Sequence, residues 1–234
     1  MAYLSRRVVR GVGSESASYS RREYVPDILT GLVLHLTMDP SRITWGTNTV
    51  TDSSGLGNHG TAVSMSAANE VSGVVGGGLT FDGSLDYINT ELSTAFTNFS
   101  AACWFYDSGS SGSNARMVDK AYSTGFYLGR GTSANQYGGG IMQTGSPFGT
   151  FVTFGTGAWY HLCMTRSGTT QSIYKNGVLA TTATVSGSAC DTAKVGIADA
   201  YGGTATNWNG YLDDVRVYNR VLTKRQVSYL ASLR

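Results

Sequence analysis

Short apolar segments alternate with turn-forming residues along the whole chain, and this pattern restricts the fold more than any other feature of the sequence. In the segment QSIYKNGVLATT (171–182), Asn176-Gly177 separates two strand-like runs and suits a type I′ hairpin, whose two turn positions need φ > 0. The other strand-like runs cover residues 31–38, 78–90, 99–106, 125–131, 158–166 and 209–220, with a turn at Asp82-Gly83. About a dozen short strands without strand–helix–strand alternation predict an all-β fold, a two-sheet antiparallel sandwich or jelly roll.

The two ends of the chain differ from this pattern. Thr223-Lys224-Arg225-Gln226 fits a capping box before VSYLASL and predicts one short C-terminal helix. Residues 1–27 show no sustained period, and their cationic side chains are Arg6, Arg7, Arg10, Arg21 and Arg22. Such a segment is either a solvated tail or a docking arm. We therefore expect an extended N-terminal docking arm over 1–27 and a jelly roll over 28–234.

Composition excludes several classes of function. The chain has 234 residues and ample apolar content for a core, whereas only 14% of its residues are charged. A net charge of +2 is too small to predict nucleic-acid binding. No apolar run approaches the roughly 18 residues of a membrane helix. The N-terminus lacks the apolar segment of a secretory signal, so either the chain is made without Sec export or the signal has been removed.

The chain has three cysteines, so they cannot all pair within one molecule. Cys103 and Cys163 lie inside apolar strand patterns, where cysteine acts as a small hydrophobe, and no spacing suits zinc. We expect buried free thiols. A single bridge and a reactive thiol are the alternatives.

Seven segments lie in an order that points to a known family: GLVLHLTMD, VTDSSGLGNHGT, GGGLTFDGSLDYI, FSAACWFY, WYHLCMTR, IYKNGVLA and GYLDDVRVYNRVLT. Together they resemble the laminin-G-like jelly-roll branch of the concanavalin-A-like lectin/glucanase superfamily. The resemblance covers roughly residues 30–232, nearly everything except the arm. It implies a curved antiparallel jelly roll of a kind that usually binds carbohydrate or protein surfaces, although some members of the superfamily are glycoside hydrolases.

A carboxylate within the last strand pattern needs an explanation. Strict alternation in YLDDVRVY places Asp213, Val215 and Val217 on one face, and a carboxylate there needs a cation or several donors. The resemblance implies a structural calcium ion where the end of the first strand, a glycine-rich loop and the last long strand meet. By position its ligands are Asp39, Asn58, His59 through its carbonyl, and Asp213. The alternative is that Asp52, Asn58 and Asp213 only cap turns.

The sequence offers no catalytic centre. A retaining glucanase needs two carboxylates about 5 Å apart. Only Glu70 and Glu91 lie within the domain, neither with an alternating acidic partner, and alternation directs Asp213 and Asp214 to opposite faces. There is no G-x-S-x-G or H-E-x-x-H motif, and His35 and His161 lie within strand patterns, where we expect them to be packed or hydrogen-bonded. We therefore expect the protein to be non-enzymatic.

Sugar sites combine aromatic faces with amide and carboxylate groups. The loops supply these as Trp208, Tyr201, Tyr137, Tyr122 and Asn207, and Trp208 is the foremost of them because GTATNWNG gives it little local core to join. The alternative for Trp208 is packing on the sandwich, which is common at this position in the family. Trp104 and Trp159 lie in strands, so we expect both in the core.

An arm, a missing signal and strand-buried cysteines together favour a phage or virus structural protein. Such a protein is made in the host cytoplasm and its jelly roll ends on the virion surface. We expect a virion decoration, fibre or appendage component, present in many copies or as an oligomer, whose arm docks on a capsid or tail scaffold and whose jelly roll binds surface glycans. The alternative is a carbohydrate-binding module or adhesin of an extracellular, secreted protein. A glycoside hydrolase comes third.

Overall fold

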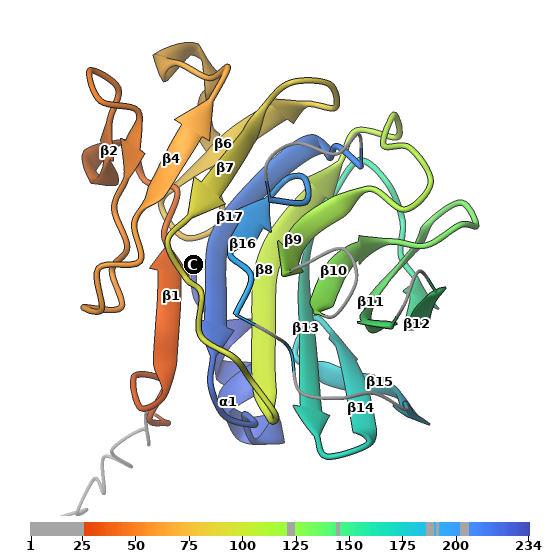
Figure 1. Cartoon of the computed structure of the whole chain (residues 1–234). Coiled ribbons are helices and arrows are strands. Elements are labelled where there is room, and N and C mark those ends of the chain that lie inside the picture. Colours follow the sequence, from red (N-terminus) through yellow and green to blue (C-terminus); the bar gives the residue numbers. More distant parts are fainter. Residues whose placement is uncertain (1–25, 121–124, 144–145, 186–189, 191, 202–205) are drawn as a thin grey trace, which may run out of the picture.

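The structure is a computed structural model that describes residues 26–120, 125–143, 146–185, 190, 192–201 and 206–234. It confirms an all-β sandwich of two antiparallel sheets with one short C-terminal helix (Figure 1). The arginines predicted to dock, from Arg6 to Arg22, lie outside the described residues, so the arm and its boundary stay predictions. No helix in the described part of the chain has the length and apolar character needed to span a membrane.

The first sheet, which we call sheet A, has the strand order β15-β14-β13-β8-β17-β6-β5, and β1 also pairs with β17. Its eight strands are β1 (Leu32–Leu36), β5 (Glu70–Ser72), β6 (Gly77–Asp82), β8 (Phe99–Asp107), β13 (Trp159–Ser167), β14 (Thr170–Lys175), β15 (Val178–Thr184) and β17 (Asn209–Tyr218).

The second sheet, sheet B, has the order β12-β11-β10-β9-β16-β7-β4-β3-β2. Its nine strands are β2 (Ile43–Thr44), β3 (Thr49–Val50), β4 (Gly60–Val63), β7 (Tyr87–Thr90), β9 (Arg116–Lys120), β10 (Phe126–Arg130), β11 (Gln136–Gln143), β12 (Ser146–Thr153) and β16 (Val195–Ile197). The helices are the 3₁₀ turns η1 (Pro40–Arg42) and η2 (Ala67–Asn69) and the α-helix α1 (Lys224–Leu230).

The turn signals of the sequence are confirmed. Asn176 and Gly177 both have positive φ, 49° and 79°, between the paired strands β14 and β15. At the second predicted turn Gly83 has φ 74°, and there the chain passes from β6 in sheet A to β7 in sheet B. Thr223 and Gln226 form the predicted capping box of α1.

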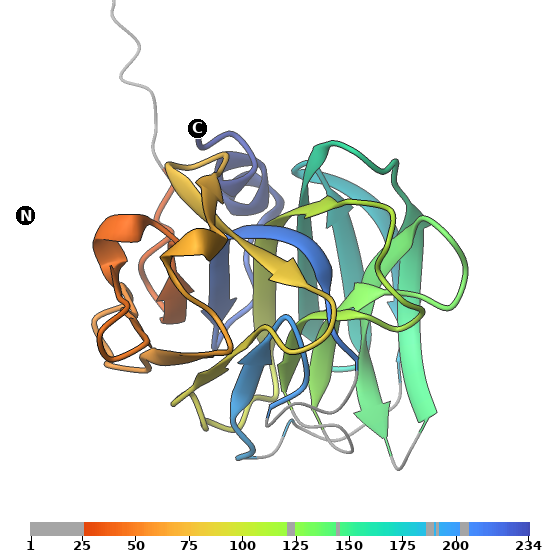
Figure 2. The same cartoon turned by 90° about the horizontal axis from the view of Figure 1, so that it is seen from above.

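The main core lies between the two sheets, and alternation decides which side chains enter it. On β8, Phe99, Ala101, Cys103 and Phe105 belong to this core, whereas Ala102 faces the other side of sheet A. There α1 covers the sheet, since Val227 and Leu230 of the helix cluster with buried residues of β8, β13, β14 and β17 (Figure 2). One end of the outer face of sheet A is therefore closed by the helix.

All three cysteines are buried and none forms a disulfide, as expected. Burial raises the pKa of the Cys103 and Cys163 thiols far above the usual value. A thiol held in its neutral form is a poor nucleophile. The reactive-thiol alternative is therefore disfavoured for these two residues.

Strand β17 departs from the alternation that its sequence predicts. Its pairing with β8 shifts register between Asp213 and Arg216, and Asp214 has φ 48°, both features of a β-bulge. Leu212, Val215 and Val217 consequently share the main core, which strict alternation does not allow. The prediction that Asp213 shares a face with Val215 and Val217 is wrong for this reason.

The bulge lies where β17 changes its neighbour. β6 pairs with β17 through Leu79 and Leu212, whereas β1 takes over on the same edge from Leu36 and Val215 onward. Asp213 and Asp214 fall in the gap between these two pairings. Carboxylates thus occupy the one place on this edge where no neighbouring strand is paired.

Candidate functional site

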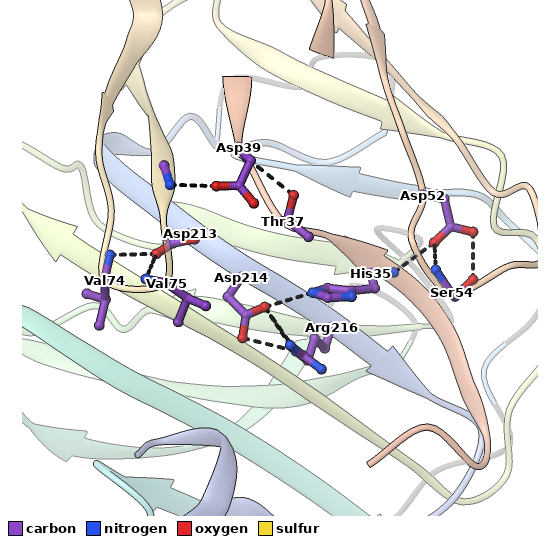
Figure 3. Close-up of polar contacts among 11 residues, drawn as sticks. His35, Thr37, Asp39, Asp52, Ser54, Val74, Val75, Asp213, Asp214 and Arg216 are labelled. Atoms are coloured by element: carbon purple, nitrogen blue, oxygen red, sulfur yellow. Dashed lines mark hydrogen bonds and ion pairs between the residues drawn. The ribbon is translucent and has the colours of Figure 1, made fainter. Parts of the chain in front are cut away.

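Two carboxylates hold the loop between β5 and β6 against this gap (Figure 3). Asp213 Oδ2 accepts hydrogen bonds from the amides of Val74 (2.6 Å) and Val75 (2.8 Å), and Asp39 Oδ1 accepts from the amide of Gly77 (2.7 Å). A Cβ atom at Gly73 would come within 2.5 Å of Asp213 Oδ2. The glycines of this loop therefore permit the close approach of both carboxylates.

Asp214, the neighbour of Asp213 on β17, has its charge balanced by a buried ion-pair network. Asp214 Oδ1 lies 2.7 Å from His35 Nε2, and Arg216 donates from Nε to both carboxylate oxygens at 3.0 Å (Figure 3). Although burial alone would raise it, the His35 hydrogen bond and the Arg216 guanidinium lower the pKa of Asp214 to about 2. His35, which lies on β1, is thus hydrogen-bonded through its ring to Asp214 of β17, in agreement with the expectation from the sequence that it is packed or hydrogen-bonded.

The polar turn TDSSGLGNHGT is organised around Asp52. This carboxylate accepts from the amides of His35 (2.9 Å), Ser54 (2.9 Å) and Asn58 (2.9 Å), and from the Ser54 hydroxyl (2.7 Å). The amide of Asp52 in turn donates to His59 Nδ1 (3.0 Å). The turn is therefore fastened to β1, and through His35 to the Asp214 network.

This arrangement corrects part of the predicted calcium ligand set. The Asn58 side chain donates to the carbonyl of Val33 (2.8 Å), and the His59 carbonyl accepts from the amide of Glu91 (3.0 Å). Figure 3 shows Asp52 on the far side of His35 from Asp39 and Asp213. The glycine-rich segment beside Asp39 and Asp213 is residues 73–77, and Asn58 and His59 belong to the turn around Asp52 instead.

Asp39 and Asp213, the two predicted ligands that remain, fit a calcium ion in part. Asp213 Oδ1 is buried without a hydrogen-bond partner among the described residues, and such an atom can take a cation. However, no three His, Cys, Asp or Glu side chains of the described part are grouped to hold a metal. Calcium therefore stays a proposal, in which Asp39 and Asp213 would supply carboxylate oxygens and backbone carbonyls and water the rest.

Burial, and not alternation, disfavours catalysis by the acids of β17. The bulge removes the geometric reason for separating Asp213 from Asp214, but the two side chains are buried and each accepts protein hydrogen bonds. The other buried carboxylates of note are Asp119, whose pKa burial raises to about 7, and Asp199, both with 0% exposure. His161 is also buried, which lowers its pKa to about 4 and keeps it neutral.

Two of the predicted sugar-binding rings lie in the core. Trp208 and Tyr137 are both 0% exposed and contact each other and Phe105, with ring centroids 4.8–6.3 Å apart. The Tyr137 hydroxyl donates to Asp107. Neither ring presents a face to solvent, so the expectation of exposed rings fails at both positions. For Trp208 the alternative of packing on the sandwich describes the structure.

The other predicted sugar-binding residues are divided. Tyr201 is 39% exposed, and the Lys194 ammonium lies 5.8 Å from its ring centroid. Asn207 is half-buried and donates to Asp199 Oδ2 (3.2 Å), so it helps to hold its own loop. Tyr122 lies outside the described residues. Of the predicted rings, Tyr201 is the one that the structure places at the surface.

A different aromatic group lies on the outer face of sheet A. Trp159 of β13, Tyr106 of β8 and Tyr211 of β17 stand in one row across three neighbouring strands. Their ring centroids are 4.9–6.1 Å apart, and Tyr106 and Tyr211 are stacked with an interplanar angle of 17°. All three are half-buried. We call these residues the aromatic cluster.

The aromatic cluster corrects the expectation that Trp159 is a core residue. Phe105 and Leu212, the strand neighbours of Tyr106 and Tyr211, point into the main core, so alternation directs the two tyrosines outward. Trp104, by contrast, is buried as expected, beneath the guanidinium of Arg234 at 4.7 Å from its ring centroid. Sequence alone could not find the cluster, because only the strand register shows that its members are neighbours.

We expect the Asp52-centred turn to be a main contributor to stability. Asp52→Ala leaves three backbone amides without their acceptor, and this should lower the free energy of unfolding by about 3 kcal/mol in urea denaturation. Ser53→Ala is the matched control, because the buried Ser53 hydroxyl has no hydrogen-bond partner in the described structure. It should change stability by less than about 0.5 kcal/mol. Equal effects of the two substitutions would contradict this role of Asp52.

The buried carboxyl of Asp213 should make stability depend on pH. Burial, offset only in part by the two backbone hydrogen bonds, raises its pKa from 3.8 to about 7. The folded protein then holds the extra proton between these values, so the free energy of unfolding falls as pH rises from about 4 to about 7. In EDTA, Asp213→Asn should remove about 2 kcal/mol of that fall between pH 5 and pH 8, measured by urea denaturation.

Calcium in place of EDTA supplies the second arm of this experiment. A cation at Asp213 would favour the ionised carboxyl, raise the melting temperature of the wild type at pH 8 and leave the Asn variant unaffected. An unchanged wild-type melting temperature would contradict the calcium proposal. A difference between wild type and variant that does not vary with pH would contradict the account of Asp213.

Comparisons with known proteins agree with this architecture. A family model described as "Concanavalin A-like lectin/glucanases superfamily" (Laminin_G_3) matches residues 76–228, well over half of the chain. No curated protein matches the sequence.

Solved structures with the same fold include a domain of an extracellular arabinanase and the binding domains of two other proteins, all of low identity. Domain 4 of AbnA, a GH43 extracellular arabinanase from Geobacillus stearothermophilus, in complex with arabinotriose, has 19% identity and a TM-score of 0.66, with 86% of this chain and 98% of that chain covered. The binding domain of Botulinum neurotoxin DC in complex with SialylT has 17% identity and a TM-score of 0.65, with 88% and 52% covered.

The binding domain of Paraclostridial Mosquitocidal Protein 1 has 14% identity and a TM-score of 0.66, with 87% and 52% covered. The chain thus spans about half the length of the toxin binding domains that it matches. At these identities the likeness establishes the fold alone, whereas the family model covers most of the packed domain. The chain belongs to the concanavalin A-like lectin/glucanase superfamily.

Proposed function

We propose that this chain is a non-enzymatic glycan-binding protein that acts in adhesion and takes sugar on its aromatic cluster. The observation that carries the proposal is the row of Trp159, Tyr106 and Tyr211, half-buried on a sheet face whose other end is packed under α1. Aromatic side chains left partly exposed side by side on a sheet are a feature of binding surfaces.

The chemistry of the cluster suits the apolar face of a sugar ring. Aromatic rings offer flat apolar surface, and the phenol groups of Tyr106 and Tyr211 and the indole N–H of Trp159 can hydrogen-bond to sugar hydroxyls. Thr80 of β6 stands opposite Tyr211 and adds a further hydroxyl at the end of the row. The ring centroids lie within 6.1 Å of one another, so the cluster matches one sugar unit better than an extended chain.

Relatives of the same fold support a sugar ligand. The AbnA domain is in complex with arabinotriose and the neurotoxin domain is in complex with SialylT. We carry over only the ligand class, because both identities are below 20%. Surface glycans are therefore the partner that we propose for this chain.

The burial of four aspartates supports a binding role over hydrolysis. Glycoside hydrolysis needs a carboxylic acid and a carboxylate that both reach one glycosidic bond. Asp119, Asp199 and Asp213 are 0% exposed, and Asp214 is 3% exposed. Hydrolysis by a pair of these four side chains would require that both be uncovered.

A second, more specific proposal concerns the kind of protein to which this domain belongs. We favour a virion decoration, fibre or appendage component at the virion surface, with the five arginines of residues 1–27 docking on a capsid or tail scaffold. The alternative is a carbohydrate-binding module or adhesin domain of an extracellular, secreted protein. The two differ in what residues 1–27 do.

Trp159→Ala should abolish or weaken glycan binding without unfolding the protein. We expect a loss of about tenfold or more in affinity for the strongest ligand of a glycan array that includes arabinotriose and sialylated oligosaccharides. Trp159→Phe should retain part of the affinity, because it keeps a ring at the same place on β13. Melting temperatures of both variants provide the control for folding.

Tyr201→Ala is the matched test of the ring that the sequence predicted and the structure places at the surface. On our proposal it binds the same glycan as well as wild type. If Tyr201→Ala loses binding and Trp159→Ala does not, the sugar site lies beside Tyr201 and the aromatic cluster is not the site. Release of reducing sugar by the wild type would overturn the non-enzymatic proposal.

Removing residues 1–27 should separate the two settings. On the virion proposal, the shortened chain keeps its glycan affinity but no longer co-sediments with the particles on which the full chain assembles. Replacing Arg6, Arg7, Arg10, Arg21 and Arg22 by glutamine should have the same effect. A shortened chain that assembles as well as the full one would contradict docking through residues 1–27, and a full chain that assembles on no particle would favour the secreted alternative.

A further inference from the structure

The aromatic cluster lies beside a second pair of rings on the outer face of sheet A. In the register of β8 with β13, Trp104 stands opposite His161, and both are buried. The next outward pair along the same two strands is Tyr106 and Trp159 of the aromatic cluster. Since residues two apart on a strand point to the same face, the two pairs stand about 7 Å apart on one surface.

Arg234 covers the second pair of rings. Its guanidinium lies 4.7 Å from the ring centroid of Trp104. Burial, together with the guanidiniums of Arg216 and Arg234, lowers the pKa of His161 to about 4, so this imidazole is neutral at pH 7. Arg216 is paired with Asp214. The positive charge that adjoins the aromatic cluster is therefore that of Arg234.

The place of Arg234 is fixed by the residue before it. Leu233 packs against the buried cluster under α1, and its amide donates to the carbonyl of Leu230 at the end of the helix (3.3 Å). Arg234 is exposed, and within the described structure its guanidinium donates one hydrogen bond, from Nη1 to the Leu233 carbonyl (3.2 Å). Because a guanidinium has several N–H donors, most of them remain for a ligand.

The neighbouring acids do not compensate this charge. Asp82 lies on the other side of the cluster, one outward position beyond Thr80, and its carboxylate accepts from the amides of Ser84 (2.8 Å) and Leu85 (3.0 Å) in its own turn. Asp213 is buried and holds the β5–β6 loop. The cluster thus has an exposed cation on one side and a carboxylate occupied by backbone amides on the other.

We propose that the aromatic cluster binds a sugar with a carboxylate group and that Arg234 binds this carboxylate. The inference rests on the proposed glycan-binding function and names the class of sugar for the same site. The rings of the cluster take the apolar face of the sugar, and its acidic group lies toward Trp104. One sugar ring with a carboxyl substituent and a hydrogen bond of about 3 Å spans the step of about 7 Å between the two pairs.

The chemistry of arginine suits this role. A guanidinium can stack on an aromatic ring and still donate two parallel N–H bonds in its own plane to a carboxylate. Trp104 therefore stays covered while Arg234 binds the ligand. A neutral sugar would use the aromatic cluster alone and would gain nothing from Arg234.

The test compares acidic glycans with their neutral counterparts on the full chain. The probes are sialyllactose with lactose, and trigalacturonate with its methyl ester, titrated by calorimetry at low salt. We expect wild type to bind at least one of the acids about tenfold more tightly than its neutral counterpart. This preference should decline in about 0.5 M NaCl, because salt screens exposed charges.

Variants of Arg234 assign the preference to this side chain. Arg234→Gln should remove it and leave the affinity for the neutral glycan unchanged, because the aromatic cluster is intact. Arg234→Lys should keep part of it, since an ammonium keeps the charge without the planar fork. Lys224→Gln is the matched control, because Lys224 is exposed at the start of α1 and its loss also removes one positive charge. Melting temperatures show whether the variants are folded.

Two outcomes would overturn the inference. They are a wild type that binds both acids no more tightly than their neutral counterparts, and a preference that Arg234→Gln leaves intact. In either case, binding of a neutral glycan that Trp159→Ala weakens would leave the proposed glycan-binding function standing. If no glycan of either kind binds, the inference and the proposed function both fail.

Discussion

The structure depends on how two strands share one edge of β17. β6 pairs with one half of that edge and β1 with the other, and the gap between them is filled by carboxylates. Asp213 holds the β5–β6 loop by its amides, and Asp214 is tied by Arg216 and His35. Since His35 also donates its amide to Asp52, the same set of acids fixes the polar turn after β3. The buried charge of Asp214 is tolerated because both of its oxygens accept hydrogen bonds, whereas Asp213 Oδ1 has no partner among the described residues and burial raises the pKa of that carboxyl.

This junction also determines which surface of sheet A can serve in binding. The bulge at Asp214 lets β17 present Leu212, Val215 and Val217 to one core while Tyr211 and Tyr218 face the other side. Tyr218 is covered by α1, whereas Tyr211 joins Tyr106 and Trp159 in the uncovered part. One strand thus contributes to the core, to the helix contact and to the aromatic cluster. The proposed glycan site is the part of this face that the helix leaves open.

Local signals in the sequence predicted the fold well, because turns and caps are local. Asn176-Gly177 and the Thr223–Gln226 capping box are present as predicted. The site was less predictable, since it depends on register and on a bulge. Strict alternation placed Asp213 on the same face as Val215 and Val217, because it does not include the bulge. Loop composition suggested that Trp208 is exposed, whereas it packs in the core. The family resemblance correctly implied that Asp39 and Asp213 lie beside one glycine-rich loop. That loop is residues 73–77, however, and Asn58 belongs to the turn around Asp52.

The most direct measurement for the glycan proposal is a titration of the four tryptophan indole N–H signals by ¹H–¹⁵N NMR. The probe is the strongest glycan from the array. Trp104 and Trp208 are buried and Trp45 donates to Glu70, so each serves as an internal reference. We predict that the Trp159 signal shifts and saturates with ligand while the other three stay in place. A saturating glycan that leaves the Trp159 signal unmoved would contradict the account.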